Sequence, residues 1–167
     1  MEQTYAIELK NITKRFGKIV ANDGINLKVK RGEILSLLGE NGSGKTTLMN
    51  MISGIYFPDE GRILVDGKAV SIRSPKDSFD LGIGMIHQHF KLIDVMTAAE
   101  NIILGLKGNA VLDMKKVHKD IQELVDRYGF DLDPAQKVYT MSVSQKQTVE
   151  IFKMLYRGAN ILILDEP

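Results

Sequence analysis

The chain has 167 residues, and its 22 Lys and Arg against 21 Asp and Glu leave a formal net charge of +1. This balance argues against a strongly basic nucleic-acid binder. The absence of cysteine excludes disulfides, thiolate metal sites and a cysteine nucleophile. The N-terminal residues have no signal-peptide pattern and no apolar run reaches the length of a membrane helix, so we expect a cytosolic chain that can dock on a membrane protein.

Short apolar segments alternate with segments of helical periodicity along the chain, which favours an α/β fold with a mainly parallel sheet. Residues from about 90 to 150 are helix-rich enough to form a subdomain of their own. The expected strands are 5–11, 24–30, 33–38, a pair within 61–70 that turns at Asp66-Gly67, 83–87 and 161–164. The expected helices are 44–53, one that opens at Ser74-Pro75, and most of 97–157 with breaks near 105–112 and 129–139.

A glycine-rich loop follows the third apolar run. Residues 39–47 read GENGSGKTT and fit the pattern G-x-x-x-x-G-K-[ST]. Glycines let backbone N–H groups curl around phosphate oxygens, and the following helix adds its positive end. Lysine can reach the β- and γ-phosphates, and the threonine hydroxyl after it can bind Mg²⁺. The alternative is a plain turn between strand and helix. The predicted phosphate-binding residues are Gly39, Asn41, Gly42, Ser43, Gly44, Lys45, Thr46 and Thr47, with Thr46 also a metal ligand.

Two carboxylates, Asp165 and Glu166, follow the last apolar run. Ligands of parallel α/β sheets lie at the carboxyl ends of the strands. Paired with the glycine-rich loop, these residues therefore predict the second half of a nucleotide site, in which Asp165 holds Mg²⁺ and Glu166 orients and polarises the attacking water. The alternative is a strand that ends in a solvated acidic turn.

With these motifs in place, the chain resembles the ATP-binding subunit of ABC transporters, and in particular the branch that imports simple sugars and nucleosides. The resemblance extends over essentially the whole chain. It rests on GENGSGKTT at 39–47, GIGMIHQHF at 82–90, TAAENIILG at 97–105, MSVSQKQTVEI at 141–151 and LYRGANILILDEP at 155–167.

The resemblance implies an α/β P-loop NTPase fold of the ABC type, with an antiparallel β subdomain, a parallel core sheet and a helical subdomain. The chain would be one incomplete nucleotide-binding domain over 1–167, truncated after the Walker B strand. The core and β subdomain would take about 1–88 and 158–167. The helical subdomain and signature helix would take about 89–157.

The resemblance also implies roles for two residues outside the glycine-rich loop and the acidic strand end. Phe16 would stack on adenine, although an aromatic residue in a core or a strand turn fits the sequence nearly as well. Gln88 would be both a catalytic residue and a metal ligand, because its neutral amide can sense Mg²⁺ and the γ-phosphate. His87 and His89 beside it are more typical of strand-end histidines than of a metal site.

The segment from Met141 occupies the place of the family signature LSGGQ. Ser142 and Gln145 match it and are predicted to contact nucleotide, whereas Val143 and Ser144 stand where glycines are usual. A side chain at Ser144 hinders the close backbone approach that glycine permits. The same residues also fit two capping boxes, Ser142-x-x-Gln145 and Ser144-x-x-Gln147. We expect both roles, with a weakened signature function.

In the family, the acidic strand is followed by a loop that crosses a dimer interface and by a central strand that ends in a histidine. Neither is present in these 167 residues. We therefore expect the N-terminal part of a longer protein that carries two such domains. As an isolated fragment, it would bind nucleotide weakly at best, turn over little, and expose strand edges that favour aggregation.

The leading hypothesis is an ATPase that binds ATP and Mg²⁺ and drives import of a sugar or nucleoside. Its partners would be a second ABC nucleotide-binding domain, in the same longer chain or as a dimer mate, transmembrane permease subunits and, indirectly, an extracytoplasmic solute-binding protein. It would be peripheral, on the cytoplasmic face of the cell membrane. One alternative is a degenerate or regulatory nucleotide-binding module without turnover. Another is a soluble ABC protein of DNA repair or translation, against which the near-neutral charge argues, and no nucleic-acid partner is expected.

Overall fold

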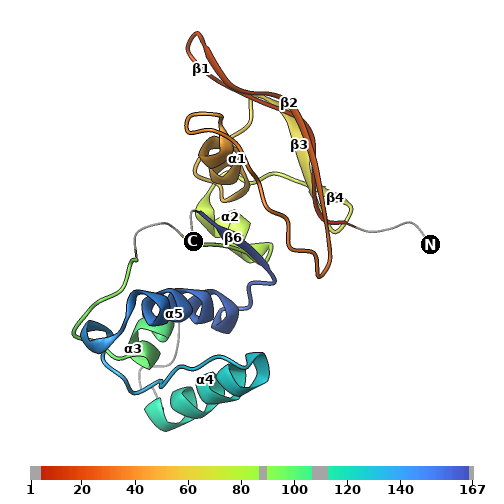
Figure 1. Cartoon of the computed structure of the whole chain (residues 1–167). Coiled ribbons are helices and arrows are strands. Elements are labelled where there is room, and N and C mark those ends of the chain that lie inside the picture. Colours follow the sequence, from red (N-terminus) through yellow and green to blue (C-terminus); the bar gives the residue numbers. More distant parts are fainter. Residues whose placement is uncertain (1–4, 87–89, 107–112, 166–167) are drawn as a thin grey trace. The chain divides into compact units, whose positions relative to one another are not determined.

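The computed structural model describes residues 5–86, 90–106 and 113–165. The chain divides into two compact units, Met1–Gly84 and Met85–Pro167. Each unit has its own secondary structure and is described in turn, and Figure 1 follows the chain through both. The predicted assignment of 158–167 to the core subdomain stays a prediction.

An antiparallel sheet of order β2-β1-β3-β4 dominates the first unit (Figure 1). Gly17 and Lys18 join the first two strands. Asp66 and Gly67 join the last two with positive φ of 49° and 76°, which a two-residue hairpin turn requires. The first two strands are longer than expected. The bounds are β1 (Tyr5–Phe16), β2 (Ile19–Lys30), β3 (Glu60–Val65) and β4 (Lys68–Val70).

Two short helices complete the first unit, α1 (Lys45–Ile52) and α2 (Pro75–Asp80). The apolar face of α1 is buried. Ser74 caps the start of α2, because its side chain accepts a hydrogen bond from the N–H of Asp77, the third helical residue. The Ser78 hydroxyl donates to the Ile52 carbonyl at 3.0 Å, which ties α2 to the end of α1. Both helices were predicted from their periodicity and start signals.

The strand predicted at 33–38 is wrong for this structure. Residues 33–40 have no regular secondary structure, and Ile34 is 96% exposed and Leu38 89% exposed. A strand depends on a neighbouring strand to pair its backbone groups. None of the six strands in the described part of the chain pairs with this run, and Ile34, Leu35 and Leu38 stay exposed to solvent. Four of those strands lie in the antiparallel sheet, so the sheet content is not mainly parallel.

The parallel pair consists of β5 (Ile83–Ile86), whose last residues open the second unit, and β6 (Ile161–Leu164). The N–H of Asp165 donates to the carbonyl of Ile86 at 3.1 Å, so the two carboxyl ends lie together. Both strands were predicted at nearly these positions. The remaining elements are α3 (Ala98–Ile103), α4 (Met114–Tyr128), the 3₁₀ turn η1 (Val138–Thr140) and α5 (Val143–Tyr156).

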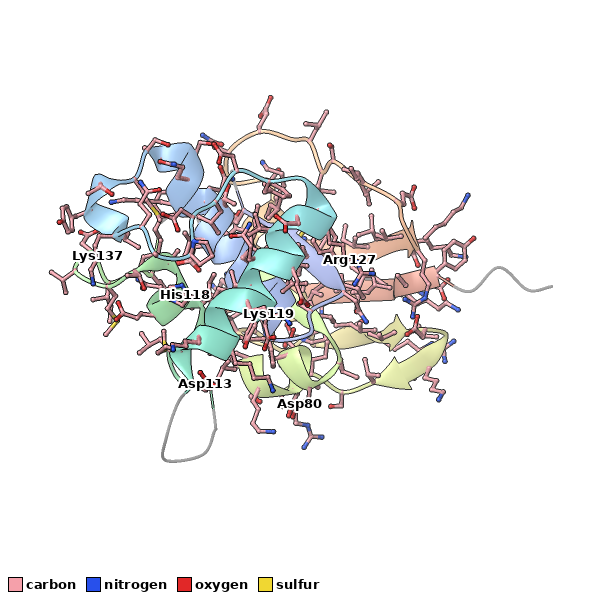
Figure 2. All side chains as sticks on the ribbon, turned by 90° about the horizontal axis from the view of Figure 1, so that it is seen from below. Asp80, Asp113, His118, Lys119, Arg127 and Lys137 are labelled. Atoms are coloured by element: carbon pink, nitrogen blue, oxygen red, sulfur yellow. The ribbon has the colours of Figure 1, made fainter. Side chains whose placement is uncertain are left out.

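The helices of the second unit pack around one apolar core, which includes Ala98, Ile102, Val117, Ile121, Val125, Val138, Val149 and Phe152. Buried residues on α4 recur at Val117, Ile121 and Val125, a spacing of four that places them on one face. Figure 2 labels Asp113, which caps the start of α4, and the polar residues His118, Lys119 and Arg127 along it. No helix in the described residues is both long and apolar enough to cross a membrane.

Candidate functional site

The glycine-rich loop enters α1 through left-handed backbone. Gly42 has φ +84° and Gly44, the residue before the helix, has φ +89°. The Ser43 N–H donates to the Glu40 carbonyl at 3.2 Å and closes the turn between them. L-residues rarely adopt such φ values, so the two glycines give the loop its curl. This is the geometry that the motif predicts.

The side chain of Lys45 folds back across this loop. Its Nζ donates to the carbonyls of Gly39 and Glu40 at 2.7 and 2.8 Å, and to the Ser43 hydroxyl at 3.4 Å. An ammonium held there adds a full positive charge to the partial charge of the helix N-terminus. Together they give this part of the loop a positive charge that would attract an anion.

The first turn of α1 leaves donors available for that anion. Within the described residues, no side chain caps this turn and it contains no acidic residue. The first N–H groups of a helix have no intrahelical partner, so they can donate to phosphate oxygens. Asn41 and the Thr46 hydroxyl are on exposed residues, and Thr47 is half-buried. The structure therefore brings the whole predicted phosphate loop together within one unit.

Phe16, the predicted base-stacking residue, ends β1 and is 41% exposed. Its ring meets Tyr56 edge to face, with centroids 5.2 Å apart, and the Lys14 Nζ lies 5.5 Å from its centroid. Lys14 and the Arg15 N–H both bind the Asp59 carboxylate, at 3.0 and 2.6 Å. The Arg15 N–H first, and then Lys14, lower the pKa of Asp59 below its usual value. The Phe16 ring is thus in contact with Tyr56 and Lys14, and its stacking on a base stays a prediction.

The predicted acidic and glutamine residues belong to the second unit. Asp165 follows β6 directly and is half-buried. Gln88 and Glu166, with His87 and His89, lie outside the described residues. Among the residues described there is no group of three or more His, Cys, Asp and Glu that could hold a metal ion.

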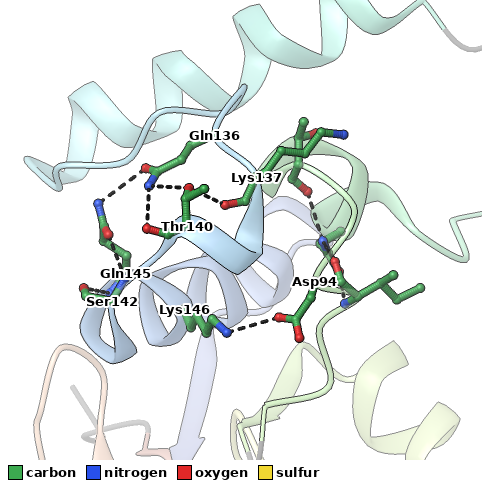
Figure 3. Close-up of polar contacts among 10 residues, drawn as sticks. Asp94, Gln136, Lys137, Thr140, Ser142, Gln145 and Lys146 are labelled. Carbon is green, nitrogen blue, oxygen red and sulfur yellow. Dashed lines mark hydrogen bonds and ion pairs between the residues drawn. The ribbon is translucent and has the colours of Figure 1, made fainter.

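The signature segment forms the N-terminus of α5 (Figure 3). The Ser142 hydroxyl accepts from the Gln145 N–H at 3.2 Å, and the Gln145 amide oxygen accepts from the Ser142 N–H at 3.0 Å. This is the first predicted capping box. The second is wrong, because the helix begins at Val143 and Ser144 therefore lies inside its first turn. Val143 is 72% exposed, so this end of the helix is open to solvent.

A polar network, which no sequence motif predicts, surrounds this helix end. The Gln145 amide donates to Gln136 at 3.4 Å, and Gln136 donates to the Thr140 hydroxyl at 3.2 Å (Figure 3). Lys146 forms an ion pair of 3.1 Å with Asp94. Gln136 and Gln145 are 9 residues apart and Asp94 and Lys146 are 52 apart, so no short sequence pattern signals these two contacts. The network ties the start of α5 to the segments before α3 and before η1.

The segment before α3 is held by a buried amide. Asn101 is fully buried, its Oδ1 accepts from the Ile93 N–H at 2.7 Å, and its Nδ2 donates to the carbonyls of Ile93 and Thr97 at 3.1 and 3.0 Å. Glu100 accepts the Thr97 N–H at 2.6 Å in a capping box that the sequence T-x-x-E could have signalled. That N–H, and then Lys137, lower the pKa of Glu100.

Comparison with known proteins identifies the family of the chain. The sequence model of the family described as ABC transporter matches residues 22–167. The chain belongs to this family.

Several relatives are import proteins. The chain is 54% identical over 165 residues to the guanosine import ATP-binding protein NupO of Bacillus subtilis (strain 168), covering 98% of this chain and 32% of the relative. It is 52% identical over 169 residues to the nucleoside import ATP-binding protein NupA of Lactococcus lactis subsp. cremoris (strain MG1363), covering 100% and 33%. It is 41% identical over 169 residues to the ribose import ATP-binding protein RbsA 2 of Escherichia coli O157:H7, also covering 100% and 33%. The chain thus spans about a third of the length of these relatives.

Solved structures share the fold. The ADP conformation of MJ1267, an ATP-binding cassette of an ABC transporter, matches with a TM-score of 0.84 and 27% identity, over 98% of this chain and 69% of that one. The predicted family and its fold of antiparallel sheet, parallel strands and helices are therefore confirmed.

Proposed function

We propose that the chain binds Mg·ATP through residues 39–47. The observation that carries this proposal is the phosphate loop itself, in which two left-handed glycines, an uncapped helix start and the Lys45 ammonium converge. The glycines and the helix start present backbone N–H donors, and the ammonium adds positive charge. Their combination suits the phosphates of a nucleotide. Phe16, with its partly exposed ring, is the proposed support for the adenine.

The donor atoms of the chain also suit Mg²⁺ that arrives with the nucleotide. Magnesium is usually held by one or two carboxylates together with phosphate oxygens, and the chain offers the exposed Thr46 hydroxyl and the Asp165 carboxylate. When bound, the ion would supply charge that neutralises the phosphates. Gln88 is proposed as a further ligand. Lys45 and the first-turn amides would hold the β- and γ-phosphates in place.

For the whole protein, we propose ATP hydrolysis that drives import through a membrane permease. Glu166 would orient and polarise the attacking water, and Ser142 with Gln145 would face nucleotide held by a second ABC domain. The names of the two relatives above 50% identity support a nucleoside as the imported solute. A permease and an extracytoplasmic binding protein would be the other components, with this chain at the cytoplasmic face of the membrane.

Replacing Glu166 tests the catalytic proposal. In a protein of the relatives' length that contains this chain, Glu166→Gln should retain Mg·ATP binding and lower steady-state hydrolysis about a hundredfold or more. Glu123→Gln, which removes an exposed carboxylate paired with Lys119 on α4, is the matched control and should leave the rate unchanged. An unaltered rate in Glu166→Gln contradicts the proposed role.

One observation favours a second candidate, a regulatory module that binds nucleotide without turnover. In the capping box, the Ser142 side chain accepts from the Gln145 N–H and the Gln145 side chain accepts from the Ser142 N–H. Ser144 is exposed at the same helix end. Side chains held in these hydrogen bonds are less free to contact the γ-phosphate of a nucleotide bound to a second domain. Nucleotide binding without hydrolysis in the longer protein would support this candidate.

A further inference from the structure

A buried asparagine on β2 lies against the phosphate loop. Asn22 is 6% exposed, and its Nδ2 donates to the Gly44 carbonyl at 3.3 Å. Its Oδ1 is buried and has no hydrogen-bond partner among the described residues. A buried acceptor without a partner lowers stability, so folding alone would favour an apolar side chain of similar shape at this position. The residue therefore calls for an explanation beyond folding.

A bulge in β2 brings the strand to the loop. Lys14 and Arg15 are consecutive on β1, but their partners on β2 are Asn22 and Val20, so Ala21 is an extra residue. Such bulges bend a strand and redirect its groups. At this point a Cβ on Gly44 would lie 2.2 Å from the Ala21 carbonyl oxygen and 2.9 Å from the Asn22 Nδ2. The loop thus packs on the bulge at a distance that only glycine allows.

The carbonyl that Asn22 contacts belongs to the peptide between Gly44 and Lys45. The same carbonyl accepts the first helical hydrogen bond, from the Leu48 N–H at 2.9 Å. A peptide is planar, so fixing the direction of its carbonyl also fixes the opposite direction of its N–H. That N–H is the backbone amide of Lys45, one of the donors at the open start of α1.

We propose that Asn22 is a positioning residue for the phosphate site. By donating to the Gly44 carbonyl, it fixes the orientation of the Gly44–Lys45 peptide and aims the Lys45 N–H into the loop, where an anion binds. The inference rests on the proposed function, because it is phosphate that this amide would meet. It adds a residue from the antiparallel sheet, outside the glycine-rich motif, to the set that prepares the site.

Asn22→Leu in the full 167-residue chain tests this role, since it removes the donor and the unpartnered oxygen at nearly constant volume. We expect hydrogen exchange of the Leu48 amide to become about fivefold faster and inorganic pyrophosphate to bind about fivefold more weakly, without a lower melting temperature. Asn22→Asp, which keeps the shape and loses the donor when ionised, should give the same faster exchange. It serves as the second variant if the leucine disturbs folding.

Asn26→Leu is the matched control on the same strand. The amide of Asn26 is exposed and bonds Asn11 and the Gly24 carbonyl, away from the loop. This variant should leave both Leu48 exchange and pyrophosphate binding unchanged. Unchanged Leu48 exchange in Asn22→Leu, or an equal acceleration at all protected amides, would overturn the proposal.

The exchange experiment needs no ligand, so it tests the role of Asn22 independently of the proposed nucleotide binding. If the unmodified chain binds neither Mg·ATP nor pyrophosphate, the proposed function is wrong. The Leu48 exchange rate still decides whether Asn22 holds the Gly44 peptide.

Discussion

Replacing Gly44 by alanine tests the packing of the phosphate loop on β2. Two effects add in Gly44→Ala. An alanine at φ +89° pays the left-handed backbone penalty, about 1–2 kcal/mol. Its Cβ would also lie 2.2 Å from the Ala21 carbonyl oxygen, a backbone atom that cannot rotate away, so the loop must shift. Overpacking of this kind lowers stability by about 1–3 kcal/mol. The expected total loss in the free energy of unfolding is about 2–5 kcal/mol.

Gly42→Ala is the control in the same loop. Gly42 has nearly the same φ, +84°, but a Cβ there would meet no atom within 4 Å. Gly42→Ala should lose only the stability that the left-handed backbone costs. The free energies of unfolding of the two variants should therefore differ by about 1–3 kcal/mol in urea denaturation. Hydrogen exchange at the start of α1 should rise in Gly44→Ala alone. Equal losses in the two variants would refute the reasoning, because the penalty would then come from φ and not from contact with the bulge.

Three further predictions concern the second unit. Ser142→Ala should lower its unfolding free energy by about 1 kcal/mol, whereas Ser144→Ala, inside the helix, should change it by less than about 0.5 kcal/mol; equal losses in urea denaturation would contradict the assigned cap. Asn101→Ala leaves the Ile93 N–H and carbonyl without their partner and should lower stability by about 3 kcal/mol, and a loss below about 1 kcal/mol would show that the amide is dispensable. The Glu100 pKa lies below its usual value near 4.5, so its charged form stabilises the fold above that pH, and this stabilisation is lost as the pH falls through the lowered value. Glu100→Gln should therefore flatten the loss of stability as the pH falls below the usual carboxyl value, and parallel pH curves for variant and parent would contradict this.

Local patterns predicted most of the elements well. The hairpin turn at Asp66-Gly67, the start of α2 at Ser74 and the cap of α5 at Ser142 each follow from short-range hydrogen bonds or backbone preferences that a few residues encode. The phosphate loop belongs to the same class, because its glycines and Lys45 act within one turn.

The features that the sequence did not predict depend on distant partners. The apolar run at 33–38 has the pattern of a strand, but a strand also needs a pairing neighbour. Asn22 has the pattern of a surface residue on an alternating strand, and its burial results from a bulge and from a loop 22 residues away. The Lys146–Asp94 pair spans 52 residues. The roles of Gln88 and Glu166 stay predictions from the resemblance.

Calorimetric titration of the chain with Mg·ATP, beside Lys45→Ala, tests the central claim most directly. Lys45 crosses the loop through contacts with Gly39, Glu40 and Ser43, and its ammonium is the one full positive charge in residues 39–47. We predict weak binding by the unmodified chain and none by the variant at the same nucleotide concentration. Binding that is equal in both, or absent from both, would contradict the account of residues 39–47 as a preformed phosphate site.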